Sequence, residues 1–244
     1  MLTVDFDRFP VEPGERILDM GCGGGRHAFA LYRQGADVVA LDMDEKELKD
    51  VADMFEAMAA EGEVPAGATA TTVRGNAYSL TFEDNSFDKI IAAEVMEHLP
   101  EDTLAMAELT RDIKPGGIIA VSVPRWLPEK VCWALSDDYH EVEGGHVRIY
   151  RGDLLKDRLT RTGLELIGDH HAHGLHAPYW WLKCAVGVDN DSNPLVKAYH
   201  RILVGDMMSA PKLTRIAERS LNPIIGKSYV VYLRKPLVRE HAAA

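Results

Sequence analysis

The stretch Ile17-Leu18-Asp19-Met20-Gly21-Cys22-Gly23-Gly24-Gly25 decides the fold, because an apolar run ends there in an acid and a glycine-dense turn. This pattern predicts a buried strand that leads into a ligand-binding loop. Glycine is needed where the backbone takes a positive φ or passes close to a ligand with no Cβ in the way. A helix predicted over residues 26–34 follows the loop, and its first N–H groups are free to bind a ligand.

The spacing of the glycines distinguishes between two kinds of nucleotide site. The dinucleotide fingerprint Gly-x-Gly-x-x-Gly would need a third glycine at position 26, where this chain has Arg26. The chain instead has the pattern Asp-x-Gly-x-Gly-x-Gly over residues 19–25. This pattern resembles motif I of the class I S-adenosylmethionine-dependent methyltransferases.

Composition excludes several classes of protein. The chain has 244 residues, 46% of them apolar, which is enough for one core with an insertion. Its 27 basic and 38 acidic residues give a net charge of −11, so we expect no nucleic-acid partner. Three separated cysteines without a Cys-x-x-Cys pair indicate a reducing cytoplasm. No stretch reads as a signal peptide or an integral membrane segment, so we expect a soluble, cytoplasmic protein.

Strands and helices alternate along the chain, which is typical of a parallel sheet covered on both faces. Helices are predicted after the second strand, where a stripe of apolar residues from Leu48 to Met58 has helical spacing, and over residues 101–112. A turn at Pro115-Gly116-Gly117 is expected to lead into the fifth strand. The predicted strands span residues 16–20, 37–41, 70–74, 88–93, 118–123, 164–171 and 228–233.

Further motifs extend the resemblance over residues 16–124. Asp42 ends the second strand, where a carboxylate can accept both ribose hydroxyls of an adenosine or can cap the next helix. Asn76 stands where the family usually has an aspartate near the adenine. Residues 84–91 and 94–99 are closely similar to elements of the ubiquinone and menaquinone biosynthesis methyltransferases. The resemblance implies cofactor contacts from Asp19, Gly21, Cys22, Gly23, Gly25, Asp42, Met43, Asn76, Ala77 and Glu94.

The same resemblance implies the architecture. Seven strands is the number in the methyltransferase sheet, so we expect an α/β fold with a Rossmann-like, doubly wound, seven-stranded mixed sheet. Residues 1–244 are expected to form a single domain. Residues 174–227, between the sixth and seventh strands, are far longer than a hairpin loop and begin a helix at Asn193-Pro194. This helical insertion is expected to cover the substrate pocket.

Three residues after the fourth strand are candidate metal ligands. Glu94, Glu97 and His98 are spaced so that one helical turn would present them together. Ubiquinone O-methyltransferases and small-RNA 2′-O-methyltransferases, which this element resembles, use a Glu-Glu-His set with Mg²⁺ or a similar ion. Many relatives with this element need no metal, in which case Glu94 can line the cofactor pocket and His98 can cap or pack. His98 is also a candidate catalytic residue.

Histidines further along the chain are candidates for a general base. His140 and His146 flank a glycine-bearing loop after the fifth strand, and His146 can also supply a fourth metal ligand. The alternative is that either histidine only anchors the loop. The cluster formed by His170, His171, His173 and His176 is interpreted as solvated or packing residues.

The acceptor is left open by the sequence. All four tryptophans fall in the two long segments after the fifth and sixth strands, which suggests an apolar, aromatic or lipid-linked acceptor. Alternatively, residues 178–182 dock the insertion on the core or on a second subunit of a homodimer. We expect O-methylation of a small molecule or of a lipid- or glycan-type acceptor. The alternative is a Rossmann protein that binds S-adenosylmethionine without catalysis or binds a nicotinamide cofactor.

Overall fold

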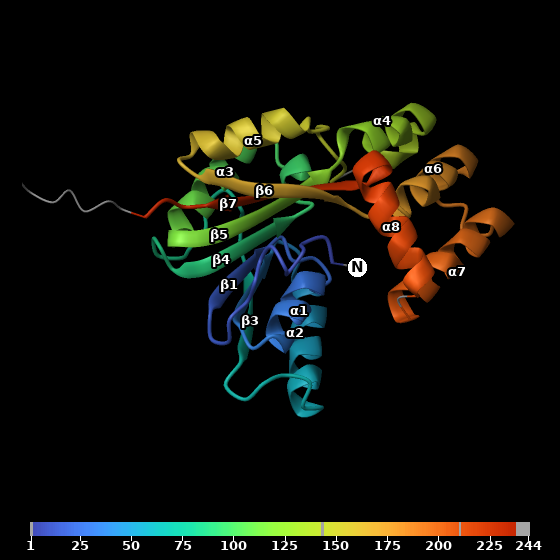
Figure 1. Cartoon of the computed structure of the whole chain (residues 1–244). Coiled ribbons are helices and arrows are strands. Elements are labelled where there is room, and N and C mark those ends of the chain that lie inside the picture. Colours follow the sequence, from blue (N-terminus) through green and yellow to red (C-terminus); the bar gives the residue numbers. More distant parts are fainter. Residues whose placement is uncertain (1, 143, 210, 238–244) are drawn as a thin grey trace, which may run out of the picture.

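The computed structural model describes residues 2–142, 144–209 and 211–237. It contains one sheet of seven strands in the order β3-β2-β1-β4-β5-β7-β6 (Figure 1). Strands β1 to β5 run parallel, and β7 is antiparallel to both β5 and β6. The strands are β1 Arg16–Met20, β2 Asp37–Asp42, β3 Thr69–Arg74, β4 Phe87–Ala93, β5 Ile113–Pro124, β6 Glu165–Ala172 and β7 Ser228–Arg234. The predicted α/β fold with a mixed, doubly wound sheet is confirmed.

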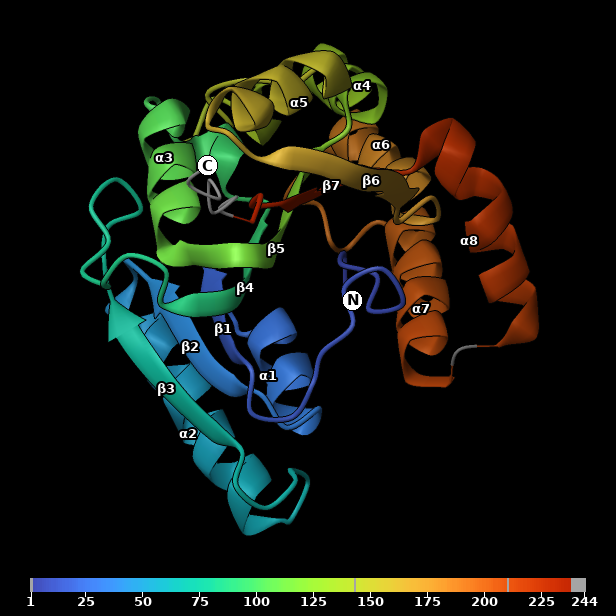
Figure 2. The same cartoon turned by 60° about the vertical axis from the view of Figure 1, so that its left-hand side comes forward.

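Helices cover both faces of this sheet. Helices α1 and α2 pack on one face and α3 and α5 on the other, as Figures 1 and 2 show. Because successive strand residues point to opposite faces, Ile17 enters the core beneath α1 and α2, whereas Leu18 enters the core beneath α3 and α5. The α-helices are α1 Arg26–Arg33, α2 Glu45–Ala60, α3 Asp102–Asp112, α4 Trp126–Leu135, α5 Gly152–Arg161, α6 His176–Val186, α7 Pro194–Ser209 and α8 Lys212–Ile225.

The predicted helix stripes lie in the core. In α2 the apolar residues Leu48, Val51, Phe55 and Met58 are all buried. Asp44 caps this helix, because its side chain accepts hydrogen bonds from the N–H groups of residues 46 and 47. The stripe therefore holds α2 on the sheet and takes no part in a site.

The fifth strand differs from the prediction. Pro115-Gly116-Gly117 does not form a turn before the strand, because β5 already begins at Ile113. Ile113 pairs with Phe87, and the register then shifts before Ile118 pairs with Lys89. The three residues thus form an irregularity inside β5, which is a place where proline and glycine are tolerated in a strand.

Residues between β6 and β7 form three helices, α6, α7 and α8, which lie together beyond one end of the sheet (Figure 2). Helix α7 begins at Pro194 as predicted, and the Asn193 side chain accepts hydrogen bonds from the N–H groups of Leu195 and Val196. Among the residues that the structure describes, no helix is both long and apolar enough to cross a membrane.

Candidate active site

The glycine loop is fixed to the ends of two neighbouring strands. The Gly21 N–H donates to the Leu41 carbonyl at 2.7 Å, and the Gly23 N–H donates to Asp42 Oδ2 at 2.8 Å. The other oxygen of Asp42 accepts from the Asp44 N–H at 3.0 Å. A carboxylate has about four lone-pair sites, so Asp42 still has acceptor capacity for a ligand.

Gly21 is needed for two independent reasons. Its φ is +71°, a left-handed conformation that costs other residues about 1–2 kcal/mol. In addition, a Cβ on Gly21 would overlap with Cγ2 of Val95 from the loop after β4. The close approach of these two loops forms the floor of a cavity.

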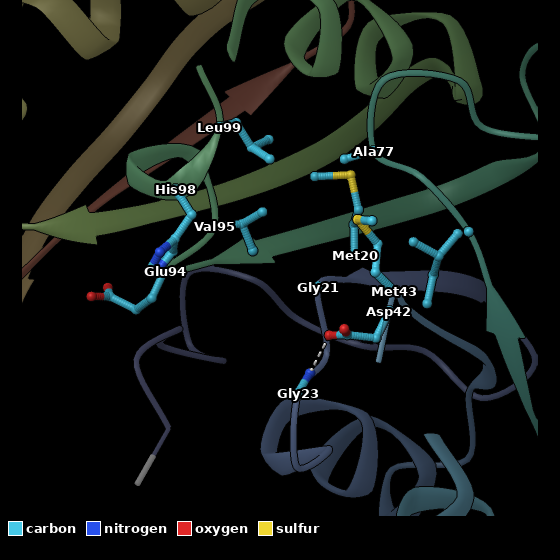
Figure 3. Close-up of a pocket in the computed structure, with 12 residues that line it drawn as sticks. Met20, Gly21, Gly23, Asp42, Met43, Ala77, Glu94, Val95, His98 and Leu99 are labelled. Atoms are coloured by element: carbon cyan, nitrogen blue, oxygen red, sulfur yellow. Dashed lines mark hydrogen bonds between the residues drawn. The ribbon is translucent and has the colours of Figure 1, made fainter. Parts of the chain in front are cut away.

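This cavity has a volume of about 340 Å³, within the range of small-molecule sites. As Figure 3 shows, Asp42 and Gly23 lie on one side of it, and Glu94 and His98 on the other. Between them the wall is mainly apolar. The lining residues are Met20, Gly21, Gly23, Leu41, Asp42, Met43, Gly75, Ala77, Glu94, Val95, His98 and Leu99.

Four predicted cofactor residues do not line this cavity. Asp19 is buried and accepts a hydrogen bond from the Ala28 N–H, so it joins β1 to α1, and burial raises its pKa to about 7. Gly25 is the N-cap of α1. Cys22 is buried, and it lines a second hollow of about 370 Å³ on the loop side, together with Arg26 and Glu94. Asn76 is exposed, and its side-chain oxygen accepts from the Tyr78 N–H.

Glu94 occupies a strained turn directly after β4. Its φ is +59°, which is uncommon for a residue with a Cβ. Two contacts to Ser122 of β5 hold this conformation: the Glu94 N–H donates to the Ser122 carbonyl, and the Ser122 hydroxyl donates to Glu94 Oε1 at 2.8 Å. The strain places the Glu94 carboxylate where the ends of β4 and β5 meet.

The predicted single helical turn that presents Glu94, Glu97 and His98 together is not present. Only residues Met96–His98 are helical, as a short 3-10 turn, and Glu94 lies outside it. The structure brings Glu97 and His98 together with His146, and the candidate ligand atoms of these three lie within 4.8 Å of one another. The reversal of the backbone at Glu94 accounts for the difference from the predicted set.

Glu97 is the most unusual residue of this cluster. It is 1% exposed, and neither carboxylate oxygen has a hydrogen-bond partner among the described residues. Burial, together with the nearby negative charge of Glu94, raises its pKa well above the usual value. A buried carboxylate without a partner is costly, and such a group points to a missing cation or proton.

Each of the two histidines of the cluster is oriented by a hydrogen bond at its Nδ1 atom. His98 Nδ1 donates to the Gly144 carbonyl at 2.7 Å, and His146 Nδ1 donates to Glu129 Oε1 at 2.6 Å. Neither Nε2 atom has a hydrogen-bond partner among the described residues, and that of His98 lies 3.9 Å from Glu97 Oε1. The centroids of the two rings are 4.8 Å apart. Orientation by a carbonyl or a carboxylate at the second nitrogen is typical of metal-binding and catalytic histidines.

Glu129 from α4 organises the side of the site remote from the cofactor loop. Burial acts to raise its pKa, but the hydrogen bond from His146 and the charge of Lys227 outweigh burial and hold the pKa below its usual value. Glu129 also accepts from Trp133 and from the Tyr139 hydroxyl. It is therefore a charged anchor with four donors around it.

His140 lies outside this arrangement. Its ring stacks on Trp133 with centroids 4.1 Å apart, and its Nδ1 contacts the Ser136 carbonyl. It belongs to a separate group with Asp137 and Glu141. Of the three histidines predicted to act in catalysis, the structure brings together His98 and His146 only.

A third cavity, of about 210 Å³, borders the first. Glu94 lines it together with Trp180 and His176 of α6 and with Lys227, which directly precedes β7. The other lining residues are Arg26, His173 and Ser228. Burial lowers the pKa of His176 to about 4 and lowers that of His173 well below its usual value, so both rings are neutral at pH 7. Glu94 thus borders all three hollows.

Sequence reasoning missed the residues that come from distant segments. Glu129, Trp180 and Lys227 stand in no local motif. Only the packing of distant segments brings Trp180 and Lys227 to Glu94, and Glu129 to His146. Arg26 was noted only for excluding the nicotinamide fingerprint. It lines two of the hollows, and its position directly after the glycine loop is the signal that could have identified it.

The fold and the site together define the class of protein. A Rossmann-type sheet extended by an antiparallel hairpin, with a glycine loop after β1 and an acid after β2, is the arrangement of the class I S-adenosylmethionine-dependent methyltransferases. Residues 18–121 match a family model described as a methyltransferase domain. This part of the chain is therefore similar to a methyltransferase domain.

Individual relatives agree in class but differ in chemistry. A 24-methylenesterol C-methyltransferase 2 from Arabidopsis thaliana is 29% identical over 191 residues, which are 74% of this chain and 50% of that protein. A ubiquinone biosynthesis O-methyltransferase from Hahella chejuensis is 34% identical over 135 residues, which are 55% of this chain and 54% of that protein. The chain spans about half the length of the curated relatives it matches.

Solved structures share the fold at low identity. A SAM-dependent methyltransferase from Methanosarcina mazei superposes with a TM-score of 0.63 at 16% identity, covering 97% of this chain and 100% of that one. The [4+2]-cyclase SpnF superposes with a TM-score of 0.61 at 19% identity, covering 95% and 78%. Because a cyclase shares the fold, the reaction has to be argued from the site.

Proposed function

We propose that the protein transfers a methyl group from S-adenosylmethionine to an oxygen of a small-molecule acceptor. The observation that carries the proposal is the position of Glu94, which borders three hollows at once. The first has the size and the acid expected for an adenosine, the second adjoins the glycine loop, and the third is enclosed by α6. Donor and acceptor would then meet beside Glu94.

The cofactor would lie across the first two hollows. Asp42 would accept the ribose hydroxyls, while Leu41, Met43 and Leu99 would enclose the adenine. The methionine end would follow the glycine loop, where Arg26 is placed to bind its carboxylate. When bound, S-adenosylmethionine supplies an electrophilic methyl group on a sulfonium, so the protein only has to align and desolvate the acceptor.

An oxygen acceptor must lose its proton, and the cluster formed by Glu97, His98 and His146 lies next to Glu94 for that step. We propose that these three residues hold a divalent cation, Mg²⁺ or a similar ion. The fit is supported by the two partnerless oxygens of Glu97 and by the free Nε2 atoms of both histidines. Two imidazoles and one carboxylate suit Mn²⁺ or Zn²⁺ better than Mg²⁺. Such an ion lowers the pKa of a bound hydroxyl.

Should no cation be used, the same geometry makes His146 a general base. Glu129 fixes the His146 tautomer that leaves Nε2 free to accept the proton. The proton would pass from the acceptor hydroxyl to Nε2 as the methyl group leaves sulfur. In both versions His140 has no role in the chemistry.

The acceptor is proposed to be an apolar or lipid-linked molecule, with Trp180 against it in the third cavity. The other role considered for residues 178–182 was contact with a second subunit of a homodimer. A homodimer is not required to explain these residues, since Trp181 Nε1 donates to the Pro128 carbonyl of α4 and so docks the insertion on the core. A cytoplasmic location is proposed from the three free cysteines, all of them buried.

Cofactor choice is tested by thermal unfolding with S-adenosylhomocysteine and with NADH. S-adenosylhomocysteine at a hundred times its dissociation constant should stabilise the protein by about 2.7 kcal/mol. NADH should leave the melting temperature unchanged. A rise with NADH and none with S-adenosylhomocysteine would overturn the proposal.

Methyl transfer is tested with labelled S-adenosylmethionine and extracts of metabolites and lipids, with Mg²⁺, with Mn²⁺ or with a chelator. Loss of transfer on chelation supports the cation, and unchanged transfer assigns the proton to His146. His146→Ala should lower turnover at least about 100-fold in both cases. His140→Ala is the matched control and should keep turnover within about twofold. Equal losses in the two variants would contradict the proposed site.

A further inference from the structure

Helix α8 has an apolar face that the described protein does not cover. None of its residues, Lys212–Ile225, is buried, although the helix is strongly amphipathic. Leu213, Ile216 and Ile224 lie on one face and are 78%, 62% and 65% exposed. The opposite face contacts the protein, because the Asn222 side chain accepts a hydrogen bond from the Gly174 N–H. The exposed face is therefore not the result of a detached helix.

Helix α7 repeats this arrangement. Val196 and Leu203 point inwards and are buried, and the Tyr199 hydroxyl donates to the Leu175 carbonyl. Further large apolar side chains of this helix are exposed. Those that are more than half exposed are Leu195, Ile202, Met207 and Met208. Together with the exposed apolar side chains of α8, they form apolar surface of the kind that often marks an interaction site.

The charge around this surface is opposite to that of the whole protein. Residues 194–225 hold five basic side chains and two acidic ones, whereas the full chain has a net charge of −11. One of the two acids, Glu218, faces the protein, and burial raises its pKa. The exposed basic residues are Lys197, Arg201, Lys212, Arg215 and Arg219. Apolar side chains flanked by cations are typical of helices that lie in the interface of an anionic membrane.

The position of the two helices links this surface to the active site. Helix α6, which precedes α7, supplies His176 and Trp180 to the third cavity. Figure 2 shows α6, α7 and α8 gathered at the same end of the sheet, away from α2. A surface that contacts α7 and α8 would therefore lie near the cavity assigned to the acceptor.

We propose that the outward faces of α7 and α8 dock the protein on a membrane surface rich in anionic phospholipid. The basic side chains contact the headgroups, and the apolar side chains enter the boundary with the acyl chains. A second copy of the chain fits less well, because pairing these faces would bring two positively charged surfaces together. The inference concerns binding to lipid and goes beyond the proposed reaction.

The test is flotation of the full chain with two kinds of vesicle, phosphatidylcholine alone and phosphatidylcholine with 30% phosphatidylglycerol. We expect binding to the anionic vesicles only. Raising the salt concentration from 0.1 M to 0.5 M should weaken binding at least tenfold, because the attraction between cations and headgroups is screened. Binding to neither kind of vesicle would overturn the inference.

Variants separate the two contributions to binding. Ile216→Asp should reduce binding to anionic vesicles at least tenfold, and Arg215→Gln and Arg219→Gln about fivefold each. The control Met54→Asp changes a residue of α2 that is 46% exposed, and binding should stay unchanged. Thermal midpoints should be the same in all variants, since every substituted side chain is exposed. Equal losses in Ile216→Asp and Met54→Asp would contradict the proposal.

Sedimentation of the protein without vesicles tests the alternative that a second copy of the chain covers this face. We expect a monomer for wild type and for Ile216→Asp. A wild-type dimer that Ile216→Asp dissociates would assign the apolar face to a second copy and overturn membrane docking. Because none of these measurements involves methyl transfer, they hold or fail independently of the proposed function.

Discussion

Two regions of the molecule differ in how tightly their residues are packed. The cofactor region comprises the glycine loop with strands β1, β2 and β4, and the cover region comprises residues 174–227. In the cofactor region, strands β1, β2 and β4 are almost fully buried, and loops are fixed by hydrogen bonds such as that from Gly23 to Asp42. In the cover region, helix α8 has no buried residue. The proposed cofactor site is therefore formed by local sequence motifs and fixed by hydrogen bonds of its loop. Helices α7 and α8 bury few residues and expose large apolar side chains.

The largest effect is expected from Gly21→Ala. The left-handed φ and the overlap with Val95 should displace the glycine loop and lower affinity for S-adenosylhomocysteine at least about 100-fold. Isothermal titration calorimetry measures this loss. Gly14→Ala is the control, because Gly14 has a φ of +83° but free space around a Cβ. If the Gly21→Ala variant bound S-adenosylhomocysteine as well as the Gly14→Ala variant does, the conformation of the glycine loop would not be needed for cofactor binding.

Asp42→Ala should lower affinity for S-adenosylhomocysteine about 30-fold. The loss combines one charge-assisted hydrogen bond to the ligand with the loosened Gly23 N–H. Asp42→Asn keeps one oxygen acceptor and should lose about fivefold. Calorimetry at constant pH compares the three proteins. Equal affinities for the alanine and asparagine variants would mean that the carboxylate does not contact the ribose.

Acid should remove the contribution that His27 of α1 makes to the stability of the protein. The buried His27 accepts hydrogen bonds from the N–H groups of Thr3 and Val4, and burial lowers its pKa to about 3. The unfolded chain therefore binds more protons below about pH 6.5, and stability is lost as the pH falls. Between pH 7 and pH 5 this group alone should remove about 2 kcal/mol from the free energy of unfolding.

Urea unfolding of His27→Gln provides the comparison for the effect of pH. Glutamine can accept a hydrogen bond but does not titrate, so the variant should lose about 2 kcal/mol less than the wild type over this pH range. Parallel pH curves for the two proteins would show that His27 is not responsible.

The sequence predicted the cofactor region well for a physical reason. Parallel strands buried on both faces appear as continuous apolar runs, so β1 was placed correctly and β2 and β4 within one residue. The predicted fifth strand was too short, because Pro115 and Gly116 were interpreted as a turn. Pairing with β4 tolerates both residues inside the strand. Local breaker signals could not reveal that long-range pairing.

The rest of the site depends on contacts between distant segments. His146 and Glu129 are 17 residues apart, and Lys227 is 98 residues from Glu129. No periodicity or motif spans such separations. The spacing of Glu94, Glu97 and His98 was interpreted as one helical turn because a positive φ at a glutamate cannot be read from the sequence.

The smallest effect is expected from removal of a helix cap. This change compares the two regions directly, because it can be made in both. Asp44→Ala removes the cap of α2, and Asn193→Ala removes the cap of α7, and each should cost about 1 kcal/mol. Since α2 packs four side chains into the core, its loss should lower the global free energy of unfolding measured in urea. Helix α7 buries only Val196 and Leu203, so Asn193→Ala should speed amide hydrogen exchange about fivefold within α7 and leave the urea midpoint unchanged. A lower urea midpoint for Asn193→Ala would show that the cover unfolds together with the core. Helix α7 would then belong to the same cooperative unit as the core beneath α2.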